Sequence, residues 1–272
     1  MRSSRTLPDG GDGTDLPLVS SPRLPRRLVL GVPALLVAAC ASPNADDEGT
    51  ATASPSDGGD TASNPVWRMP DEGEPHERTW LAFGASAQIW GEDLVPVVQQ
   101  NLADIANAIV AFEPVTILVR DSDIDTARTL LDAAVEIQPA ELDDLWIRDT
   151  GPVFVVGDDD GTPVLGGVNF NFNGWGDKQE HAADARVAGE VTDAAEATAV
   201  PTELVLEGGG LEVDGHGTAI ITRSCVLNDN RNPGWSQEDV EAELSRLLGI
   251  RSVIWLPGIA GRDITDGHTD FY

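Results

Sequence analysis

The feature that most constrains the fold of this chain is an alternation of helical and strand patterns that begins near Pro65. Apolar residues recur at helical spacing over residues 94–109, and the short β-branched run Val115–Val119 follows directly. A second helix is predicted over residues 123–134, with Ser122 as its N-cap. This pattern predicts a mixed α/β fold for residues 65–272, and the 41% apolar content is enough for a sizeable core.

Two β-hairpins are predicted between the helical segments, each from two short apolar runs around a glycine-containing acidic turn. Their strands are Val153–Val156 with Val164–Val168, and Leu211–Val213 with Thr218–Thr222. The mixture of hairpins and helices indicates small units that repeat in structure, although no exact sequence repeat is visible.

The helix predicted over residues 236–248 has start and stop signals of its own. Ser236 and Asp239 have the spacing of a capping box, and Gly249 is placed to end the helix. The run Val253–Leu256 then returns as a strand.

Residues 1–40 have the pattern of an export signal, and residues 41–64 that of a disordered tether. Paired Arg26 and Arg27 precede an apolar run that is too short to span a bilayer and ends in Leu36-Val-Ala-Ala-Cys40. Small residues before a cysteine resemble a bacterial lipoprotein cleavage site, so we predict lipidation at Cys40, a membrane anchor and an outward-facing location; a plain signal peptide is the alternative. The paired arginines also leave twin-arginine export open.

The formal net charge of -29, from 17 basic and 46 acidic residues, argues against nucleic acid or an anionic membrane surface as a partner. It would attract cationic ligands. Biased codon usage or adaptation to salt accounts for this composition as well as ligand attraction does.

Cys40 and Cys225 are the two cysteines of the sequence. If Cys40 is acylated, Cys225 has no disulfide partner, and the fold must rest on its core. Cys225 lies in the apolar, strand-like run Ile220–Leu227, where a buried structural thiol is expected in preference to a nucleophile.

Asp266, His268 and Asp270 follow one another at a spacing of two residues. On an extended segment this spacing places all three side chains on one side, where carboxylates and an imidazole can converge on one substrate.

Other carboxylates accompany this cluster. Asp149 is expected at a strand end, before Thr150 and Gly151, and Glu207 at the end of an apolar strand, before a run of glycines. Taken singly, each has an ordinary structural explanation, such as a turn cap.

Taken together, several segments of the chain resemble the landmarks of agmatine deiminases and bacterial-type peptidyl-arginine deiminases. In chain order these segments are Met69–His76, Trp146–Pro152, Phe170–Trp175, Glu207–Gly209, Asn228–Pro233 and Asp266–Asp270. The resemblance implies a five-bladed, pseudosymmetric α/β propeller built from ββαβ units and incomplete in these residues. It also implies that no metal ion or organic cofactor is required.

The resemblance implies a role for each matching residue. Asp149 and Asp270 match the carboxylates that hold a guanidinium, and His268 matches the general acid and base. Glu207 matches the carboxylate that orients this histidine. Trp146 and Asn173 are predicted to contact substrate. Asp266 is expected to shape its loop.

The family's reaction needs a cysteine thiolate that attacks the central guanidinium carbon. In relatives this cysteine lies in a glycine-rich stretch beyond the histidine motif. We therefore expect the domain at residues 65–272 to lack its C-terminal part, the nucleophile to lie past Tyr272, and the 272 residues to be inactive by themselves.

The resemblance implies hydrolysis of agmatine to N-carbamoylputrescine and ammonia. Gly73 stands where relatives acting on agmatine usually carry a tryptophan, which would widen the pocket, and citrullination of peptidyl-arginine is the first alternative. A non-catalytic guanidinium-binding lipoprotein and an amidinotransferase of the same superfamily are the others.

Overall fold

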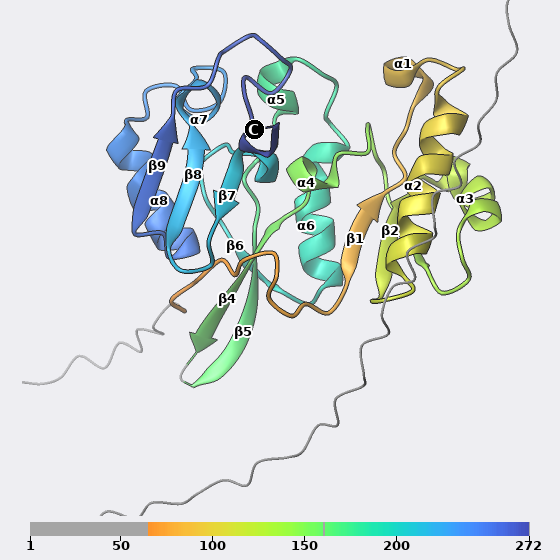
Figure 1. Ribbon diagram of the computed structural model, residues 1–272, viewed down its shortest axis with the longest axis horizontal. Helices are drawn as coiled ribbons and strands as arrows, with labels where there is room; N and C mark the ends of the chain where they lie inside the picture. Colours follow the sequence, from red (N-terminus) through yellow and green to blue (C-terminus); the bar gives the residue numbers. More distant parts are fainter. Residues whose placement is uncertain (1–64, 160, 272) are drawn as a thin grey trace, which may run out of the picture. The chain divides into compact units, whose positions relative to one another are not determined.

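The computed structural model describes residues 65–159 and 161–271 (Figure 1). The predicted signal segment, the tether and Cys40 lie outside the described residues. No helix in the described part of the chain is long and apolar enough to cross a membrane.

Within residues 65–159 and 161–271, nine strands alternate with helices and short helical turns. In chain order they are β1 (Thr79–Ala82), α1 (Ala87–Trp90), α2 (Val95–Ile109), β2 (Val115–Val119), η1 (Asp121–Asp123), α3 (Ile124–Leu130), β3 (Glu136–Pro139), α4 (Ile147–Thr150), β4 (Val153–Asp159), β5 (Thr162–Val168), α5 (Gly174–Asp177), α6 (Asp184–Ala194), β6 (Thr198–Val200), η2 (Gly208–Gly210), β7 (Leu211–Val213), β8 (Thr218–Thr222), α7 (Arg223–Val226), α8 (Gln237–Leu248), β9 (Ser252–Leu256) and η3 (Thr269–Phe271). The prediction of a mixed α/β fold is confirmed.

The described strands form three three-stranded sheets, with orders β1-β2-β3, β4-β5-β6 and β7-β8-β9. The first sheet is parallel throughout. In each of the other two, an antiparallel hairpin is followed by a helix and a parallel third strand. Apart from the one-turn helices, this is the ββαβ order that the family resemblance implies.

Both predicted hairpins are confirmed. Val153 pairs with Val168 at the open end of the first hairpin, and Leu211 pairs with Ile221 in the second. In the second turn the side chain of Asp214 accepts hydrogen bonds from the backbone N–H groups of His216 and Thr218, at 2.8 Å each. Such an Asx-type turn closes a hairpin locally, which is why its position could be read from the sequence.

The helix predicted over residues 236–248 is confirmed as α8, and the capping box is present in full. The side chain of Ser236 accepts a hydrogen bond from the backbone of Asp239, whose side chain in turn accepts one from the backbone of Ser236. Gly249 ends the helix in the left-handed conformation, at a φ of 67°.

The prediction for α3 was wrong in its length and its cap. The helix ends at Leu130, and Ser122 lies inside the preceding turn η1 while Asp123 occupies the N-cap position. The backbone of Leu131 is already extended, so the apolar residues beyond it do not continue the helical face.

Helices join neighbouring sheets through their apolar faces. Val187 and Val191 of α6 pack with Ala82 and Leu118 of the first sheet, and α6 also contacts β5 and β6 of the second. Leu244 of α8 belongs to a cluster that includes residues of both the second and the third sheet. The core therefore continues from one sheet to the next through the helix between them.

Three local expectations for the site segments were wrong. Asp149 lies in the one-turn helix α4, because Trp146 O accepts from its backbone N–H and starts a helical turn. The backbone N–H and C=O of Val205 both form hydrogen bonds with the side-chain amide of Asn232. They therefore do not pair with a neighbouring strand, and no strand leads into Glu207. Asp266 turns the chain with a φ of 65°, so residues 266–270 are not extended.

Candidate active site

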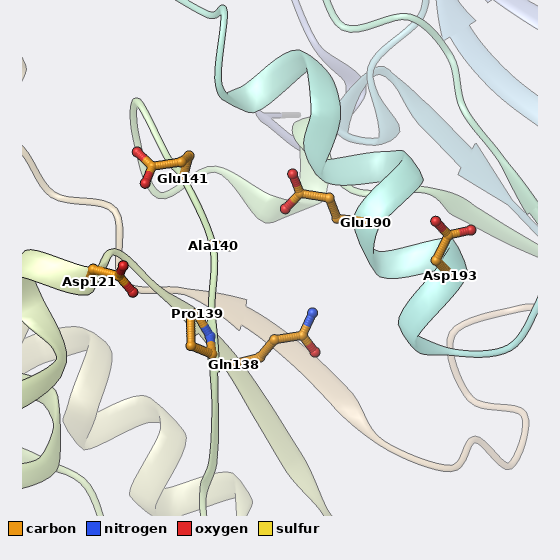
Figure 2. Close-up of a pocket in the computed structure, with 7 residues that line it drawn as sticks. All are labelled: Asp121, Gln138, Pro139, Ala140, Glu141, Glu190 and Asp193. Carbon is orange, nitrogen blue, oxygen red and sulfur yellow. The ribbon is translucent and has the colours of Figure 1, made fainter.

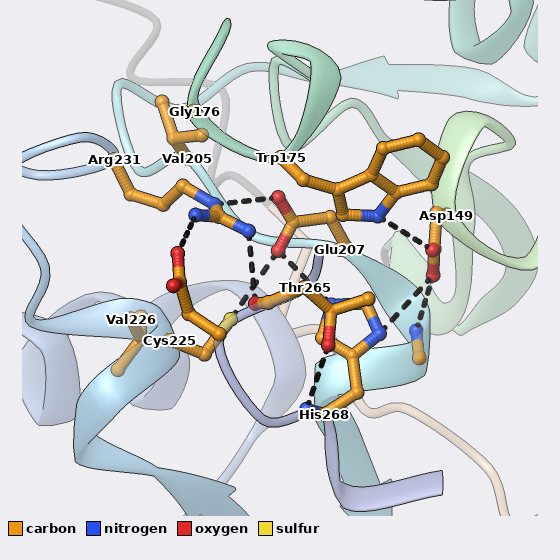
Figure 3. A network of polar contacts seen from close by, with 12 residues as sticks. Asp149, Trp175, Gly176, Val205, Glu207, Cys225, Val226, Arg231, Thr265 and His268 are labelled. Carbon is orange, nitrogen blue, oxygen red and sulfur yellow. Dashed lines mark hydrogen bonds and ion pairs between the residues drawn. The ribbon is translucent and has the colours of Figure 1, made fainter. Parts of the chain in front are cut away.

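The four residues predicted as catalytic lie together in the described fold. Asp149 comes from α4, Glu207 from the residue before η2, and His268 and Asp270 from the C-terminal turn. The imidazole Nδ1 of His268 is 3.8 Å from Oδ1 of Asp149 and 3.8 Å from Oδ1 of Asp270. Its Nε2 is 3.3 Å from Oε2 of Glu207 (Figure 3). The imidazole therefore lies between the carboxylate of Glu207 on one side and the carboxylates of Asp149 and Asp270 on the other.

Gly209 leaves the space in which these groups meet. A Cβ atom built on Gly209 would lie 2.7 Å from Asp149 Oδ1, 2.7 Å from Asp270 Oδ2 and 2.7 Å from His268 Nδ1. Real Cβ atoms are not found this close to such atoms. A glycine at this position therefore allows the three polar groups to face a common point beside the backbone.

The protonated form of His268 is favoured by its neighbours. Burial lowers the pKa of the imidazole, but the hydrogen bond to Glu207 and the charges of Asp149, Glu207 and Asp270 outweigh burial and raise it overall. A raised pKa suits a group that donates a proton near neutral pH.

Asp149 is held by two donors from different elements. The indole N–H of Trp175 donates to its Oδ2 at 3.0 Å (Figure 3). The backbone N–H of Gly209 donates to its Oδ1 at 3.0 Å. Burial raises the pKa of Asp149 and outweighs the lowering effect of His268 and of these hydrogen bonds. Trp175 reaches this position from a left-handed backbone conformation, with a φ of 57°.

A pocket of about 310 Å³ opens onto this cluster. Its polar lining includes Asp149, His268 and Asp270, and its apolar wall includes the stacked rings of Trp90 and Trp146, whose centroids are 6.3 Å apart. Both indole N–H groups donate to the buried carboxylate of Asp144, at 2.8 Å and 3.0 Å. The rings are thereby fixed at the pocket wall.

Of the two residues Trp146 and Asn173, which were predicted to contact substrate, one lines the pocket and the other does not. Trp146 lines the pocket. Asn173 is outside the lining: its side chain accepts from the backbone of Gly176 and donates to the carbonyl of Asn230. The amide of Asn173 therefore braces the loop that carries Trp175.

Asp266 also lies outside the pocket lining, in a fully paired environment. Its carboxylate contacts Lys178 at 2.7 Å and Arg231 at 2.9 Å, and it accepts hydrogen bonds from Asn230 and Gly261. Although burial acts in the other direction, these partners hold the pKa of Asp266 at about 2. Its placement agrees with the expected role in shaping the loop.

Cys225 is buried and does not line the pocket. It lies in the short helix α7, where a strand-like run had been expected, because β8 ends at Thr222. Burial, together with the nearby charge of Glu207, raises the pKa of the thiol well above its ordinary value. A thiol of this kind is a poor nucleophile.

Glu207, Cys225 and His268 place one possible metal-ligand atom each within 4.8 Å of one another. The three groups already satisfy each other, since Oε2 of Glu207 faces both Cys225 Sγ and His268 Nε2. Arg231 balances the charge of the same carboxylate at 2.7 Å. We therefore interpret this group as a hydrogen-bonded cluster.

A second hollow, of about 520 Å³, lies between the loop that follows β3 and helix α6 (Figure 2). Its polar lining consists of Gln138 and carboxylates from Asp121, Glu141, Glu190 and Asp193. Its lining contains no imidazole and no thiol.

Residues 68–272 match the family described as Porphyromonas-type peptidyl-arginine deiminase. The chain belongs to this family.

Relatives of known organism agree with the family assignment. A Streptomyces coelicolor homologue is 44% identical over 214 residues, which are 75% of this chain and 62% of that protein. The agmatine deiminase of Stutzerimonas stutzeri is 40% identical over 209 residues, which are 74% of this chain and 56% of that protein. The chain thus spans 56–62% of the length of these relatives.

The fold of this family member also matches solved structures. The agmatine deiminase of Enterococcus faecalis superimposes with a TM-score of 0.70 and 32% sequence identity, over 75% of this chain and 57% of that one.

Sequence reasoning assigned no role to several residues that complete the site. Trp175 and Arg231 lie in segments that carried the family resemblance, and their side chains contact Asp149 and Glu207 respectively. Gly209 was part of the glycine run after Glu207. Their positions in those segments were the available signal. Their contacts with Asp149 and Glu207 could not be predicted, because the partners are 24 to 60 residues apart in sequence.

Proposed function

We propose that this chain carries the substrate-binding and acid–base part of an agmatine deiminase. Such an enzyme converts agmatine and water into N-carbamoylputrescine and ammonia. The observation that carries this proposal is the convergence of Asp149, Asp270 and His268 on the space beside Gly209. The names of the relatives from Stutzerimonas stutzeri and Enterococcus faecalis support agmatine as the substrate.

A guanidinium is a planar cation whose N–H groups lie in one plane, so carboxylates in that plane can bind it through charge-assisted hydrogen bonds. Asp149 and Asp270 are the groups that we assign to this task. The apolar wall of Trp90 and Trp146 lies in the same pocket and suits the methylene chain of agmatine.

The reaction requires a thiolate to attack the guanidinium carbon and form a carbon–sulfur bond. His268 then protonates the departing nitrogen, which leaves as ammonia. In the second half His268 removes a proton from water, water adds to the same carbon, and the carbon–sulfur bond breaks to give the ureido product. Glu207 orients the imidazole through its Nε2 in both halves.

We infer that the nucleophilic cysteine comes from polypeptide beyond these 272 residues. The raised pKa and buried position of Cys225 argue against that residue as the nucleophile. On this proposal the 272 residues bind substrate but do not turn it over.

We also infer that the complete protein is a five-bladed propeller. The unit order strand, strand, helix, strand in two of the described sheets, and the helices that join neighbouring sheets, support this architecture.

Calorimetry with agmatine tests the binding proposal on the 272-residue chain. We expect agmatine to bind and putrescine, which lacks the guanidinium, to bind far more weakly. Asp270→Asn and Asp149→Asn should each weaken agmatine binding by about 30-fold or more, because each removes one charged partner of the guanidinium. Asp125→Asn is the control, since the Asp125 side chain is fully exposed on α3.

Equal affinity for agmatine and putrescine would contradict the proposal. A preference for arginine-containing peptides over agmatine would favour peptidyl-arginine as the substrate.

Turnover requires the product of the full reading frame. Sequencing the encoding DNA past the codon for Tyr272 will show whether a glycine-rich cysteine segment follows. We expect that product to release ammonia from agmatine in water alone. Release that depended on an added amine acceptor would indicate an amidinotransferase, and binding with no release would indicate a non-catalytic binding protein.

We propose export as a lipoprotein anchored through Cys40, possessing either a general or a twin-arginine signal. The sequence Leu36–Cys40 and the preceding arginines support this proposal. Expression in a bacterium fed radiolabelled palmitate should label the wild-type chain, and Cys40→Ala should abolish the label. Labelling that persists in Cys40→Ala would contradict the proposal.

A further inference from the structure

The segment Asn228–Pro233 carries family resemblance, yet the chemistry proposed above assigns it no task. Arg231 and Asn232 are its buried residues, and the side chain of Arg231 is 0% exposed. A buried guanidinium is costly unless its N–H groups are paired, so its partners indicate why it is there.

Arg231 contacts both the carboxylate that holds the His268 imidazole and the turn that carries His268. Its Nε donates to Oε1 of Glu207 at 2.7 Å, and Glu207 in turn contacts the imidazole Nε2 through its other oxygen (Figure 3). Its Nη1 donates to Oδ2 of Asp266 at 2.9 Å, and its Nη2 to the carbonyl of Thr265 at 3.1 Å. The hydroxyl of Thr265 accepts from the backbone N–H of His268.

We propose that Arg231 is a positioning residue, which fixes the Glu207 carboxylate against His268 and ties it to the turn that carries the imidazole. The planar fork of a guanidinium reaches both partners in fixed directions, which a lysine ammonium on a flexible stem would not do. The inference rests on the proposed function, because it takes His268 as the acid–base group.

Charge gives Arg231 a second effect on the same histidine. The groups that face the cluster are Asp149 from α4, Cys225 from α7, Asp270 from η3, Glu207, and Asp263 and Asp266 from the final turn, with Arg231 and Lys178 as cations. Lys178 contacts Asp266, whereas Arg231 contacts Glu207 itself. Arg231 is thus the cation next to the carboxylate that holds the imidazole.

Removal of the Arg231 charge makes the surroundings of Glu207 and His268 more negative. The pKa values of this coupled pair therefore rise. An imidazole that stays protonated serves as an acid but cannot later act as a base. Arg231 therefore keeps Glu207 ionised while leaving the proton of His268 removable.

NMR titration of the histidine side chains tests this inference without turnover. The chain has 4 histidines, so the His268 signals can be assigned by comparison with His268→Asn. Arg231→Met should raise the pKa of His268 by about one unit or more, which is a tenfold increase in proton affinity. A pKa within about 0.2 unit of the wild-type value, in a folded variant, would overturn the inference.

Arg231→Lys is the second variant, because it keeps the charge and will remain informative if Arg231→Met does not fold. We expect a His268 pKa near that of the wild type but faster exchange of the Nε2 proton with water, since Glu207 is no longer held in place. An unchanged exchange rate would overturn the positioning role.

Cys225→Ala is the matched control, because Cys225 contacts the same carboxylate through a weak neutral donor at 3.4 Å. It should leave the His268 pKa nearly unchanged, and a shift as large as that of Arg231→Met would overturn the specific role of Arg231.

The titration and the agmatine calorimetry separate the two proposals. If the His268 titration depends on Arg231 in a chain that does not bind agmatine, the proposed function alone is wrong. If the chain binds agmatine and the titration is independent of Arg231, this inference alone is wrong.

Discussion

The absence of a side chain at Gly209 determines how much room the candidate site offers. Three functional atoms from two segments, α4 and the C-terminal turn, lie around the position that a Cβ would occupy. The φ of Gly209 is not in the left-handed region, so an alanine can adopt the same backbone conformation. Its methyl group would fill the space between the three polar groups.

We therefore expect Gly209→Ala to weaken agmatine binding by at least tenfold, because the methyl group occupies the place of the guanidinium or displaces the carboxylates. Calorimetry measures the affinity, and thermal unfolding checks that the fold persists. Gly189→Ala is the control, since a Cβ at this position of α6 meets no atom within 4 Å. Full-strength binding by Gly209→Ala would place the guanidinium elsewhere.

At the residue scale the sequence indicated His268, Asp149, Asp270 and Glu207, and these side chains do converge. Asn173 was expected at the substrate, but it braces a loop. The difference arises because a motif identifies a residue type at a position, whereas the direction of its side chain depends on partners elsewhere in the chain.

Several elements with strong local signals were predicted to within a residue or two, whereas β4 extends beyond its predicted end at Val156 to Asp159. The strands β2, β7 and β8 have the predicted bounds, because turn residues and β-branched runs act over a few positions. The one-turn helices α4 and α7 were not predicted. Segments this short have too few residues to show a helical period.

The capping box of α8 gives a prediction at this scale. Ser236→Ala should lower the free energy of unfolding by about 1 kcal/mol, because the backbone N–H of Asp239 loses its side-chain acceptor. The midpoint of urea unfolding measures this change. Ser245→Ala, at an exposed position inside the same helix, should be neutral or slightly stabilising. An equal loss in both variants would show that the cap has no special role.

At the scale of the whole molecule, the sheets are joined by helices that contribute to shared clusters. Leu244 is fully buried in the cluster that contains Val155 of the second sheet and Ile221 of the third. Leu204 and Leu206 also belong to this cluster, so the segment that leads into Glu207 packs in the same core.

Leu244→Ala should lower the free energy of unfolding by roughly 2–5 kcal/mol, through lost apolar contact and the cavity left behind. Urea unfolding followed by circular dichroism measures the effect. Leu94→Ala, at a half-exposed position before α2, is the matched control and should change stability by about 0.5 kcal/mol or less. A small effect of Leu244→Ala would mean that the two sheets do not share a core.

The sequence by itself determined the alternation of helices and strands, the two hairpins, the capping box and the residue types of the candidate site. These features depend on periodicity and turn chemistry over a few residues. Only the tertiary structure decided which groups meet and what they do to one another. His268 meets Glu207 across 61 residues of sequence, and Asp149 meets Gly209 across 60. Burial and charge at those contacts raise the pKa of His268 and of Asp149, and no local pattern records them.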